Sequence, residues 1–404
     1  MSVTASDVLA ARAAVETVAR RTPILSTRTF SERAGGTVVL KAENLQRTGS
    51  FKVRGVANKL ATLGEEGCAR GVVAASAGNH AQALAAAAAA RGVRCEVYVP
   101  ADAPMAKVEA TRGSGAIVHV GGDSVDACVG AALERAEQGG LAFVHPFDDP
   151  AIVAGQGSLG LELLEDVPDL AKVVIPVGGG GLAAGVALAV KAARPEVEIV
   201  GVQAAACAPF PASMAKGEPV EASSALTIAD GIAVKRPGGI TLPILTELAD
   251  DMVTVGEDQT AEAMALLLER CKLVVEGAGA VGVAALLGGQ VKPAAQGTTV
   301  AVLSGGNVDA GLLAAIARRH ETESGRRLVL LTRVADRPGG LAGLLATVAG
   351  TGANIVDVSH VREGLDLHVR ETAIELVLET RGHDHAQRVL ATLNETGYAA
   401  QVLR

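Results

Sequence analysis

The sequence predicts an α/β protein: an open sheet wound with helices on both faces, followed by a small ferredoxin-like domain. Three observations lead to this prediction. From about residue 38 to 320, short β-branched runs alternate with Ala-rich stretches. Several runs are apolar almost throughout, which is typical of parallel strands covered on both faces. After residue 327 the rhythm changes to β-α-β-β-α-β in fewer than 80 residues.

In the first part, strands and helices are expected to alternate regularly. The expected strands are Val38–Leu40, Val72–Ala74, Cys95–Val99, Ala116–Val120, Val173–Val177, Ile199–Gln203 and Thr298–Leu303. The expected helices include Ala81–Arg91, Val125–Gln138, Leu182–Ala193, Thr260–Cys271 and Ala310–Arg319. The Ala-rich tract at residues 81–90 has the composition of a strong helix, because Ala is the best helix former.

A polar segment, Glu321–Arg327, is expected to be a linker to the C-terminal part. Strands are then expected at Leu328–Arg333, Ala353–Val361, Thr372–Thr380 and Tyr398–Leu403, with helices at Gly339–Gly350 and His383–Thr396. The strand at 372–380 alternates strongly between apolar and polar residues, as a strand with one covered face does. This order of elements is that of a ferredoxin-like domain.

Composition excludes several classes of protein. The chain has 404 residues and a net charge of −8, and no Lys/Arg run offers a nucleic-acid surface. Its five cysteines are scattered without a C-x-x-C pair, which favours a reducing cytoplasm. Residues 173–190 are uncharged, but Pro176 and the glycines at 178–181 prevent one continuous helix. We therefore expect a cytoplasmic protein with no membrane or nucleic-acid partner.

The most informative stretch is Gly49-Ser50-Phe51-Lys52-Val53-Arg54-Gly55. Its two glycines let the backbone approach a bound group closely. A Lys amine forms Schiff bases with carbonyls, including the aldehyde of pyridoxal phosphate (PLP). Taken alone, Lys52 could equally be a solvated residue at the start of a helix. Three further motifs, each supplying something else that PLP requires, favour the catalytic interpretation.

The run Ser76-Ala77-Gly78-Asn79-His80-Ala81-Gln82 follows a strand and opens a helix. Its small residues expose amides at a helix N-terminus, which suits a carboxylate. Asn79 could donate a hydrogen bond to a phenolic oxygen, although Ser or Asn here could also simply cap the helix. His80 receives no role, because a histidine on a packed helix is more often structural.

Gly178-Gly179-Gly180-Gly181-Leu182 follows another strand and starts another helix. Successive amides and the helix dipole form a phosphate cradle. The same loop also fits a loose dinucleotide fingerprint. That fingerprint requires an acidic residue at the end of the next strand, where this chain has Gln203-Ala204. A simple phosphate is therefore the better prediction.

Ser304-Gly305-Gly306-Asn307 follows the strand at 298–303, and ligands of such sheets bind at the carboxyl ends of strands. A neutral Ser hydroxyl beside a pyridine nitrogen stabilises a protonated ring less than an Asp would. The ring would then be a weaker electron sink, which favours prompt β-elimination over transamination. Considered alone, Ser-Gly-Gly is also a common turn between strand and helix.

Together these motifs resemble the threonine dehydratase (threonine ammonia-lyase) family of fold type II PLP enzymes, which are tryptophan synthase β-like. Asp148-Asp149, the run at residues 155–158 and Glu276-Gly277-Ala278-Gly279-Ala280 also fall in family order. The resemblance covers essentially residues 20–320. The tail, with Asp336-Arg337-Pro338-Gly339 and Asn354, resembles an ACT regulatory domain.

The resemblance implies a role for each motif. It implies that Lys52 carries PLP, that Phe51 packs beside the ring and that Asn79 contacts the ring oxygen. Gly178, Gly179, Gly180, Gly181 and Leu182 would hold the phosphate, Ser304 would meet the ring nitrogen, and Ser76, Gly78 and Asn79 would orient the substrate carboxylate. It also implies a two-lobed catalytic domain at 1–325, with a smaller mobile lobe at about 55–147, and an ACT domain at 326–404.

Two positions distinguish this chain from some relatives. Relatives that racemise serine carry Ser at the position of Ala77, so Ala favours elimination over racemisation. Many relatives have an acidic cation ligand where this chain reads Gln203-Ala204-Ala205, so no bound metal is expected.

The resemblance implies an enzyme that dehydrates and deaminates L-threonine to 2-oxobutanoate and ammonia, and acts on serine more slowly. The alternatives are a serine-preferring dehydratase and an amino-acid sensor whose catalytic half has decayed. The tail suggests an effector site at Asp336, Arg337, Gly339 and Asn354, with isoleucine as the candidate inhibitor in isoleucine biosynthesis and valine as the candidate antagonist. A homotetramer or homodimer is expected.

Overall fold

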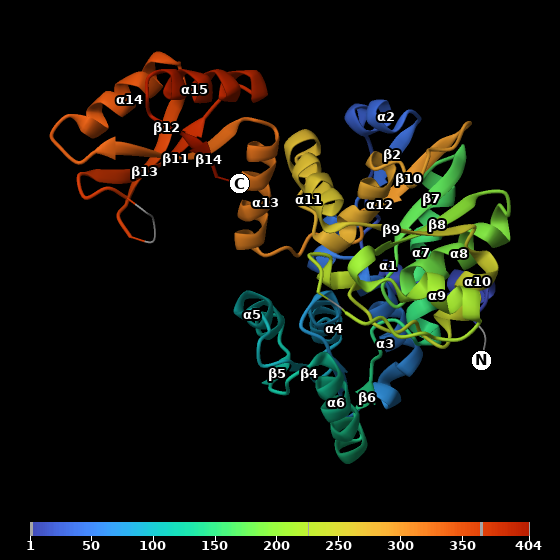
Figure 1. The fold of residues 1–404 in the computed structure, drawn as a ribbon. Coiled ribbons are helices and arrows are strands. Elements are labelled where there is room, and N and C mark those ends of the chain that lie inside the picture. Colours follow the sequence, from blue (N-terminus) through green and yellow to red (C-terminus); the bar gives the residue numbers. More distant parts are fainter. Residues whose placement is uncertain (1–2, 225, 364–366, 404) are drawn as a thin grey trace. The chain divides into compact units, whose positions relative to one another are not determined.

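The computed structural model describes residues 3–224, 226–363 and 367–403, and the chain divides into two compact units. The first unit is Met1–Asp309 and the second is Ala310–Arg404. Both are drawn in Figure 1, in which blue to yellow-orange marks the first unit and orange to red marks the second.

The larger sheet of the first unit has six strands in the order β1-β2-β10-β7-β8-β9. All neighbouring strands are parallel except β1 and β2. The bounds are β1 Ile24–Ser26, β2 Val38–Lys41, β10 Thr298–Val302, β7 Leu170–Pro176, β8 Glu198–Ala204 and β9 Asp251–Val255. The sheet is surrounded by helices α1 (Ala5–Glu16), α2 (Arg28–Ala34), α7 (Pro150–Asp166), α8 (Gly181–Ala193), α9 (Pro209–Lys216), α10 (Thr241–Leu248), α11 (Glu257–Leu266) and α12 (Gly277–Leu287) (Figure 1). Strands β7 and β10 are buried along nearly their whole length, as their continuous apolar runs predict.

The smaller sheet has four parallel strands in the order β5-β4-β3-β6. The bounds are β5 Ile117–Val120, β4 Cys95–Val99, β3 Val72–Ala75 and β6 Ala142–Phe143, and the accompanying helices are α4 (Asn79–Ala89), α5 (Met105–Gly113) and α6 (Val125–Gly139). Helix α3 (Lys52–Cys68) contacts both α4 and α7, so it belongs to both halves of the unit. The expectation of one open sheet was therefore wrong, because the periodicity identifies strands but not their partners. The four strands all fall within residues 55–147, the range expected for the smaller lobe; its mobility stays a prediction.

The core contains few aromatic side chains, and its helices pack close to one another. Helices α7 and α8 cross where Gly157 faces Gly185. A Cβ added to Gly185 would lie 2.3 Å from the carbonyl oxygen of Val153 and 2.6 Å from the amide nitrogen of Gly157. Only glycine fits such a crossing, which lets small Ala and Val side chains fill the core at native density.

Most predicted elements are confirmed with boundaries shifted by a few residues. Residues 173–190 form a strand, a glycine loop and a helix as expected. The expected helix at 260–271 is α11 followed by a π-helical turn, Leu267–Cys271. The linker predicted at Glu321–Arg327 was wrong, because helix α13 (Ala310–Glu323) runs into it and contacts strand β11 of the second unit. The second unit therefore starts earlier than residue 326.

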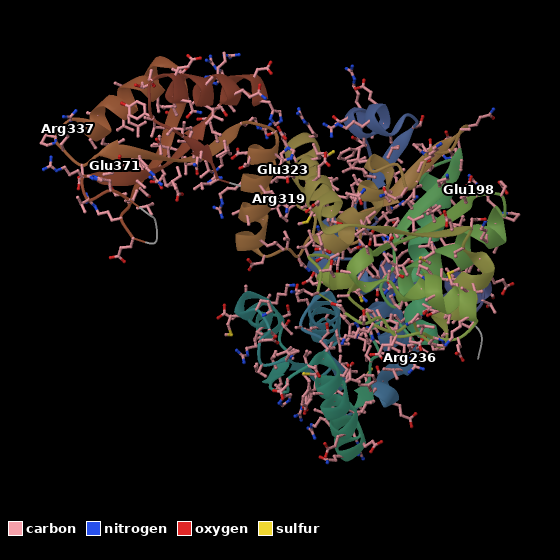
Figure 2. All side chains as sticks on the ribbon, viewed as in Figure 1. Glu198, Arg236, Arg319, Glu323, Arg337 and Glu371 are labelled. Atoms are coloured by element: carbon pink, nitrogen blue, oxygen red, sulfur yellow. The ribbon has the colours of Figure 1, made fainter. Side chains whose placement is uncertain are left out.

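The second unit contains a four-stranded antiparallel sheet in the order β12-β13-β11-β14. Its elements are β11 Arg327–Ala335, α14 Gly340–Gly350, β12 Asn354–Val361, β13 Glu371–Glu379, α15 His383–Glu395 and β14 Gln401–Val402. This connectivity is the predicted ferredoxin-like arrangement. Burial alternates along β11, so that Leu328, Leu330 and Val334 enter a core shared with α14 and α15. On α13, Arg319 and Glu323 form an ion pair one helical turn apart (Figure 2).

Among the residues that the structure describes, no helix combines the length and apolarity that a membrane span requires.

Candidate active site

The predicted residues gather around one cavity of the first unit. It is lined by Phe51, Lys52, Asn79, Pro146, Phe147, Gln156, Pro176, Gly178, Gly179, Gly180, Gly181, Leu182, Gly231, Ile232, Val234, Glu276, Ala278 and Ser304. Most of these residues come from the starts of α3, α4, α8 and α12 and from the ends of β7 and β10 with the loops that follow them, and the others from α7, the loop after β6 and the segment at 231–234; the cavity therefore lies at the carboxyl ends of the larger sheet's strands. Ser76 and Gly78, expected to bind substrate, lie on the loop before α4 and are not among the lining residues.

The lysine motif and the Ser304–Asn307 motif, far apart in sequence, are paired in space. The amide of Phe51 donates to the carbonyl of Ser304 (3.1 Å), and the amide of Gly306 donates to the carbonyl of Gly49 (2.9 Å). Gly49 has φ +72°, and a Cβ there would lie 2.3 Å from Oδ1 of Asn307. Glycine at this position therefore lets the two motifs approach, which places Lys52 and Ser304 on one wall.

Lys52 is half-buried, and its Nζ has few partners. It donates to the carbonyl oxygen of Pro146 (3.0 Å) and lies 5.1 Å from the centre of the Phe51 ring. Burial lowers the pKa of Lys52 to about 8, while the nearby Glu276 opposes this shift. Roughly one tenth of this amine is therefore neutral at pH 7, far more than for a lysine with an ordinary pKa, and the neutral form is the nucleophile.

Glu276 is a buried carboxyl group that sequence reasoning quoted but gave no role. It is 4% exposed and its Oε1 accepts a hydrogen bond from Nδ2 of Asn79 (2.7 Å). Burial and the charge of Asp230 raise the pKa of Glu276 to about 7. The sequence did contain a signal for Glu276, which is an acidic residue before a run of small residues at a helix start. Acidic residues are common at helix N-termini because they interact favourably with the helix dipole, so this signal alone indicated no role.

The glycine loop has the features of an anion cradle. Gly180 has φ +95°, and the hydroxyl of Thr241 holds the loop by donating to the carbonyl of Gly179 (2.6 Å). The amides of Gly178, Gly179 and Gly180 donate to no acceptor among the described residues. The first amides of α8 add further unpaired donors at the positive end of a helix dipole. This donor set fits a phosphate group.

Two other residues have structural explanations. His80 is buried, its Nε2 lies 2.8 Å from the carbonyl of Val144, and burial lowers its pKa to about 3. A histidine that stays neutral throughout the physiological range is a poor candidate for acid–base work. Gln203 donates to the carbonyl of Val177 (3.1 Å) and accepts from the amide of Phe210 (2.9 Å), so it ties the loop after β8 to the sheet.

The predicted effector residues do not form one site within a single copy of the second unit. Asp336 follows Ala335, which pairs with Glu371 at one end of β13. Asn354 pairs with Glu379 at the other end of β13, and its side chain donates to that carboxylate (3.1 Å). Figure 2 shows Arg337 and Glu371 at the same end of the unit. Asp336 forms an ion pair with Arg362 (2.9 Å), and the effector site expected between paired copies stays a prediction.

Comparison with known proteins identifies the class to which this fold and site belong. Residues 15–305 match the family model described as "Pyridoxal-phosphate dependent enzyme". The chain is 44% identical to L-threonine ammonia-lyase of Thermotoga maritima over 402 residues, covering 99% of this chain and all of that protein. It is 45% identical to L-threonine ammonia-lyase of Geobacter sulfurreducens, over 95% of this chain and 96% of that protein.

Solved structures agree with these relatives. The processed form of threonine deaminase isoform 2 from Solanum lycopersicum aligns with a TM-score of 0.72 and 36% identity, covering 77% of this chain and 90% of that one. Maize serine racemase aligns with a TM-score of 0.75 and 32% identity, covering 80% of this chain and 99% of that one. The chain belongs to the family of pyridoxal-phosphate-dependent enzymes, in its two-lobed fold type II form, and its cofactor is pyridoxal phosphate.

Proposed function

We propose that this protein is a lyase that converts L-threonine to 2-oxobutanoate and ammonia, with L-serine as a slower substrate. The observation that carries the proposal is the similarity to L-threonine ammonia-lyase along 99% of the chain, at 44% identity. The intact lysine, glycine loop and cavity-lining serine support it, and they argue against a sensor whose catalytic half has decayed.

The residues around the cavity have complementary tasks. Bound PLP supplies the electron sink for the negative charge that develops at the substrate Cα. The amides of the loop at 178–182 hold its phosphate, Lys52 anchors it, and Ser304 meets its ring nitrogen. Nζ of Lys52, with a pKa of about 8, takes the Cα proton and can then protonate the departing β-hydroxyl. The loop that contains Ser76, Gly78 and Asn79 orients the substrate carboxylate; the amides of Ser76 and Gly78 themselves donate within the protein, to the carbonyl of Tyr98 (3.0 Å) and to Oγ of Ser76 (3.2 Å).

Lys52→Ala tests this function directly. The wild-type protein should absorb in the visible and release 2-oxobutanoate from L-threonine, while Lys52→Ala should lose both properties and still bind PLP weakly through the glycine loop. Keto-acid release from L-threonine, L-serine and their β-substituted analogues gives the substrate preference. Wild-type turnover by Lys52→Ala would contradict the assignment, and a higher kcat/KM for L-serine would favour the serine-preferring alternative. One methyl group allows only modest discrimination, about 10- to 200-fold.

We also propose that the second unit is an ACT domain that regulates the first by binding a free amino acid. The ferredoxin-like connectivity supports this, and so does the extent of the relatives: L-threonine dehydratase catabolic TdcB of Escherichia coli matches over 281 residues, only 69% of this chain. Since Asp336 and Asn354 lie at opposite ends of one sheet, a site using both requires two copies of the unit, in a homodimer or homotetramer.

Removal of residues 310–404, the whole second unit, is the test of regulation. Threonine saturation is measured for the intact and shortened proteins, with and without isoleucine or valine. We expect isoleucine to inhibit only the intact protein, with a coupling of about 5- to 150-fold in affinity. If the intact protein ignores every branched-chain amino acid and the deletion changes only oligomer size, the second unit has an assembly role instead.

A further inference from the structure

The carboxamide of Asn79 is held from two sides. Its Nδ2 donates to Oε1 of Glu276 (2.7 Å), and its Oδ1 accepts from Nδ2 of Asn307 (2.7 Å). Gly305 leaves room for this arrangement, because a Cβ there would lie 2.3 Å from Oε1 of Glu276 and 3.1 Å from Nδ2 of Asn79. The amide of Glu276 also donates to the carbonyl of Gly305 (3.1 Å), which fixes the carboxylate's backbone to the same loop.

The chemistry of the partners determines which way each amide points. Nδ2 of Asn307 also donates to the carbonyl oxygen of Thr48 (2.8 Å), and a carbonyl can only accept. The NH2 group of Asn307 therefore faces Thr48, and of its other two acceptors Oδ1 of Asn79 (2.7 Å) lies closer than Oε1 of Gln82 (3.3 Å), so that Asn79 presents its oxygen to Asn307. An ionised Glu276 can likewise only accept, so Asn79 presents its nitrogen to Glu276. The constraint from Asn307 does not depend on pH, and above a pH of about 7, where Glu276 is ionised, Glu276 requires the same orientation.

We propose that Asn307 and Glu276 are positioning residues that lock the Asn79 side chain so that it offers the cofactor an N–H donor and not its carbonyl oxygen. Asn79 lines the cavity, and one N–H of its NH2 group remains after the bond to Glu276. This inference rests on the proposed role of Asn79 beside the PLP ring oxygen. A reversed Asn79 would present an acceptor to that oxygen and repel it.

Asn307→Asp is the decisive variant, because it keeps the shape and removes the donor. Asn44→Asp is the matched control: Asn44 is buried, whereas Asn307 is half-buried, and like Asn307 it donates to a main-chain carbonyl, that of Val274 (3.1 Å), while Asn79 has no hydrogen bond with it. PLP affinity of the apoprotein, the visible absorption maximum of the PLP-loaded protein and the melting temperature of the apoprotein are measured for both. We expect both variants to lower the melting temperature. Only Asn307→Asp should weaken PLP binding, by about tenfold or more, and shift the absorption maximum.

Glu276 provides a second and separate comparison, which decides the matter if Asn307→Asp does not fold. Glu276→Gln keeps an acceptor, and Asn307 selects the orientation in which the Gln carbonyl faces Asn79, so PLP affinity should stay within about threefold. Glu276→Leu removes the acceptor and should weaken binding by about tenfold or more. Equal effects of Gln and Leu, or equal effects of Asn307→Asp and Asn44→Asp, would overturn the proposal. None of these measurements uses threonine, so a wrong substrate would leave them unchanged, whereas a wild-type protein that bound no PLP would contradict the cofactor instead.

Discussion

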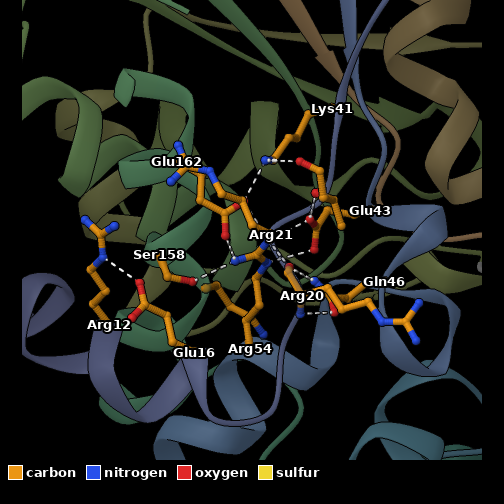
Figure 3. A network of polar contacts seen from close by, with 12 residues as sticks. Arg12, Glu16, Arg20, Arg21, Lys41, Glu43, Gln46, Arg54, Ser158 and Glu162 are labelled. Atoms are coloured by element: carbon orange, nitrogen blue, oxygen red, sulfur yellow. Dashed lines mark hydrogen bonds and ion pairs between the residues drawn. The ribbon is translucent and has the colours of Figure 1, made fainter. Parts of the chain in front are cut away.

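Arg54, two residues after Lys52, is the centre of a buried ionic network (Figure 3). Its guanidinium bonds both carboxylate oxygens of Glu43 (2.8 Å each) and also bonds Glu162 (2.7 and 3.0 Å). The Arg54 and Glu43 side chains are 1% and 0% exposed. Ser158 accepts a further bond from Arg54 (3.2 Å), and Lys41 pairs with Glu162 (2.6 Å). The network joins the start of α3 to β2 and α7.

Replacing Arg54 with Met should be strongly destabilising, because it leaves the Glu43 carboxylate buried without its main partner. Removing one member of a buried pair costs about 3–5 kcal/mol. Lys41 remains as a partner for Glu162 and attracts Glu43 electrostatically, so we expect about 3 kcal/mol. The matched control is Arg28→Met. The Arg28 and Glu32 side chains form an ion pair (2.7 Å) and are 89% and 63% exposed. Loss of such an exposed pair costs about 0.5 kcal/mol or less.

The pH dependence distinguishes a lost charge partner from lost packing. Burial alone would raise the pKa of Glu43, but Arg54 outweighs burial and holds this pKa below its ordinary value. In the wild type, the stability from Glu43 is therefore present above the unfolded pKa of about 4.3 and is lost as pH falls through the lowered folded pKa. Without Arg54, burial raises the folded pKa, so the penalty is complete above it and shrinks as pH falls toward about 4.3.

The assay is urea unfolding at pH 7.5 and pH 5.0, with reversibility checked, for the wild type, Arg54→Met and Arg28→Met. The difference between the wild type and Arg54→Met should be larger at pH 7.5. A loss below about 1 kcal/mol, or the same loss at both pH values, would refute the reasoning that an unpaired buried charge dominates.

Three further predictions concern the cofactor site. Gly179→Ala should weaken PLP binding by about tenfold or more, because its Cβ would lie 2.3 Å from a ring carbon of Phe147. The control is Gly130→Ala, at a helix position with nothing within 4 Å, which should stabilise the protein by up to about 1 kcal/mol. Equal PLP affinity in the two variants would contradict the close packing of the loop. The rate at which the apoprotein binds PLP covalently should rise with pH and level off above about 8, where Lys52 is neutral; a flat profile from pH 6 to 9 would contradict the lowered pKa. Ala77→Ser should raise racemisation of L-serine relative to elimination, measured as D-serine against pyruvate, and substantial D-serine from the unmodified protein would count against the role given to Ala77.

The sequence carried enough local information for most strands of the two units, but β1, β6 and β9 were not predicted. Runs such as 170–176 and 298–302 are buried on both faces, and this burial explains why their residues are apolar almost throughout. The glycine loop was predicted because strand, glycines and helix are contiguous in sequence. Strand partners were not predictable in this way: nothing in the run at 72–75 distinguishes a second sheet from the first.

The site residues that were missed share one property, which is that their importance arises from partners distant in sequence. Glu276 matters because Asn79 meets it across 197 positions, and Asn307 because it meets Asn79 across 228. Local patterns cannot report such contacts. The same limitation applies to Asp336 and Asn354, since the motif spacing contains no information on the strand order that places them at opposite ends of β13.

The buried network and the cavity share one short segment of α3, which links stability to catalysis. Lys52 and Arg54 are separated by a single residue, so Arg54 anchors the first turn of the helix while Lys52 faces the cavity. A shift of about 1 Å in a reacting group costs on the order of 100-fold in rate. Arg54→Met should therefore lower turnover even under conditions in which the protein remains folded, whereas Arg28→Met should not. If folded Arg54→Met retains wild-type kcat and visible absorption, then the pairing of the lysine motif with Ser304 and Gly306 is sufficient to position Lys52 without the ionic network.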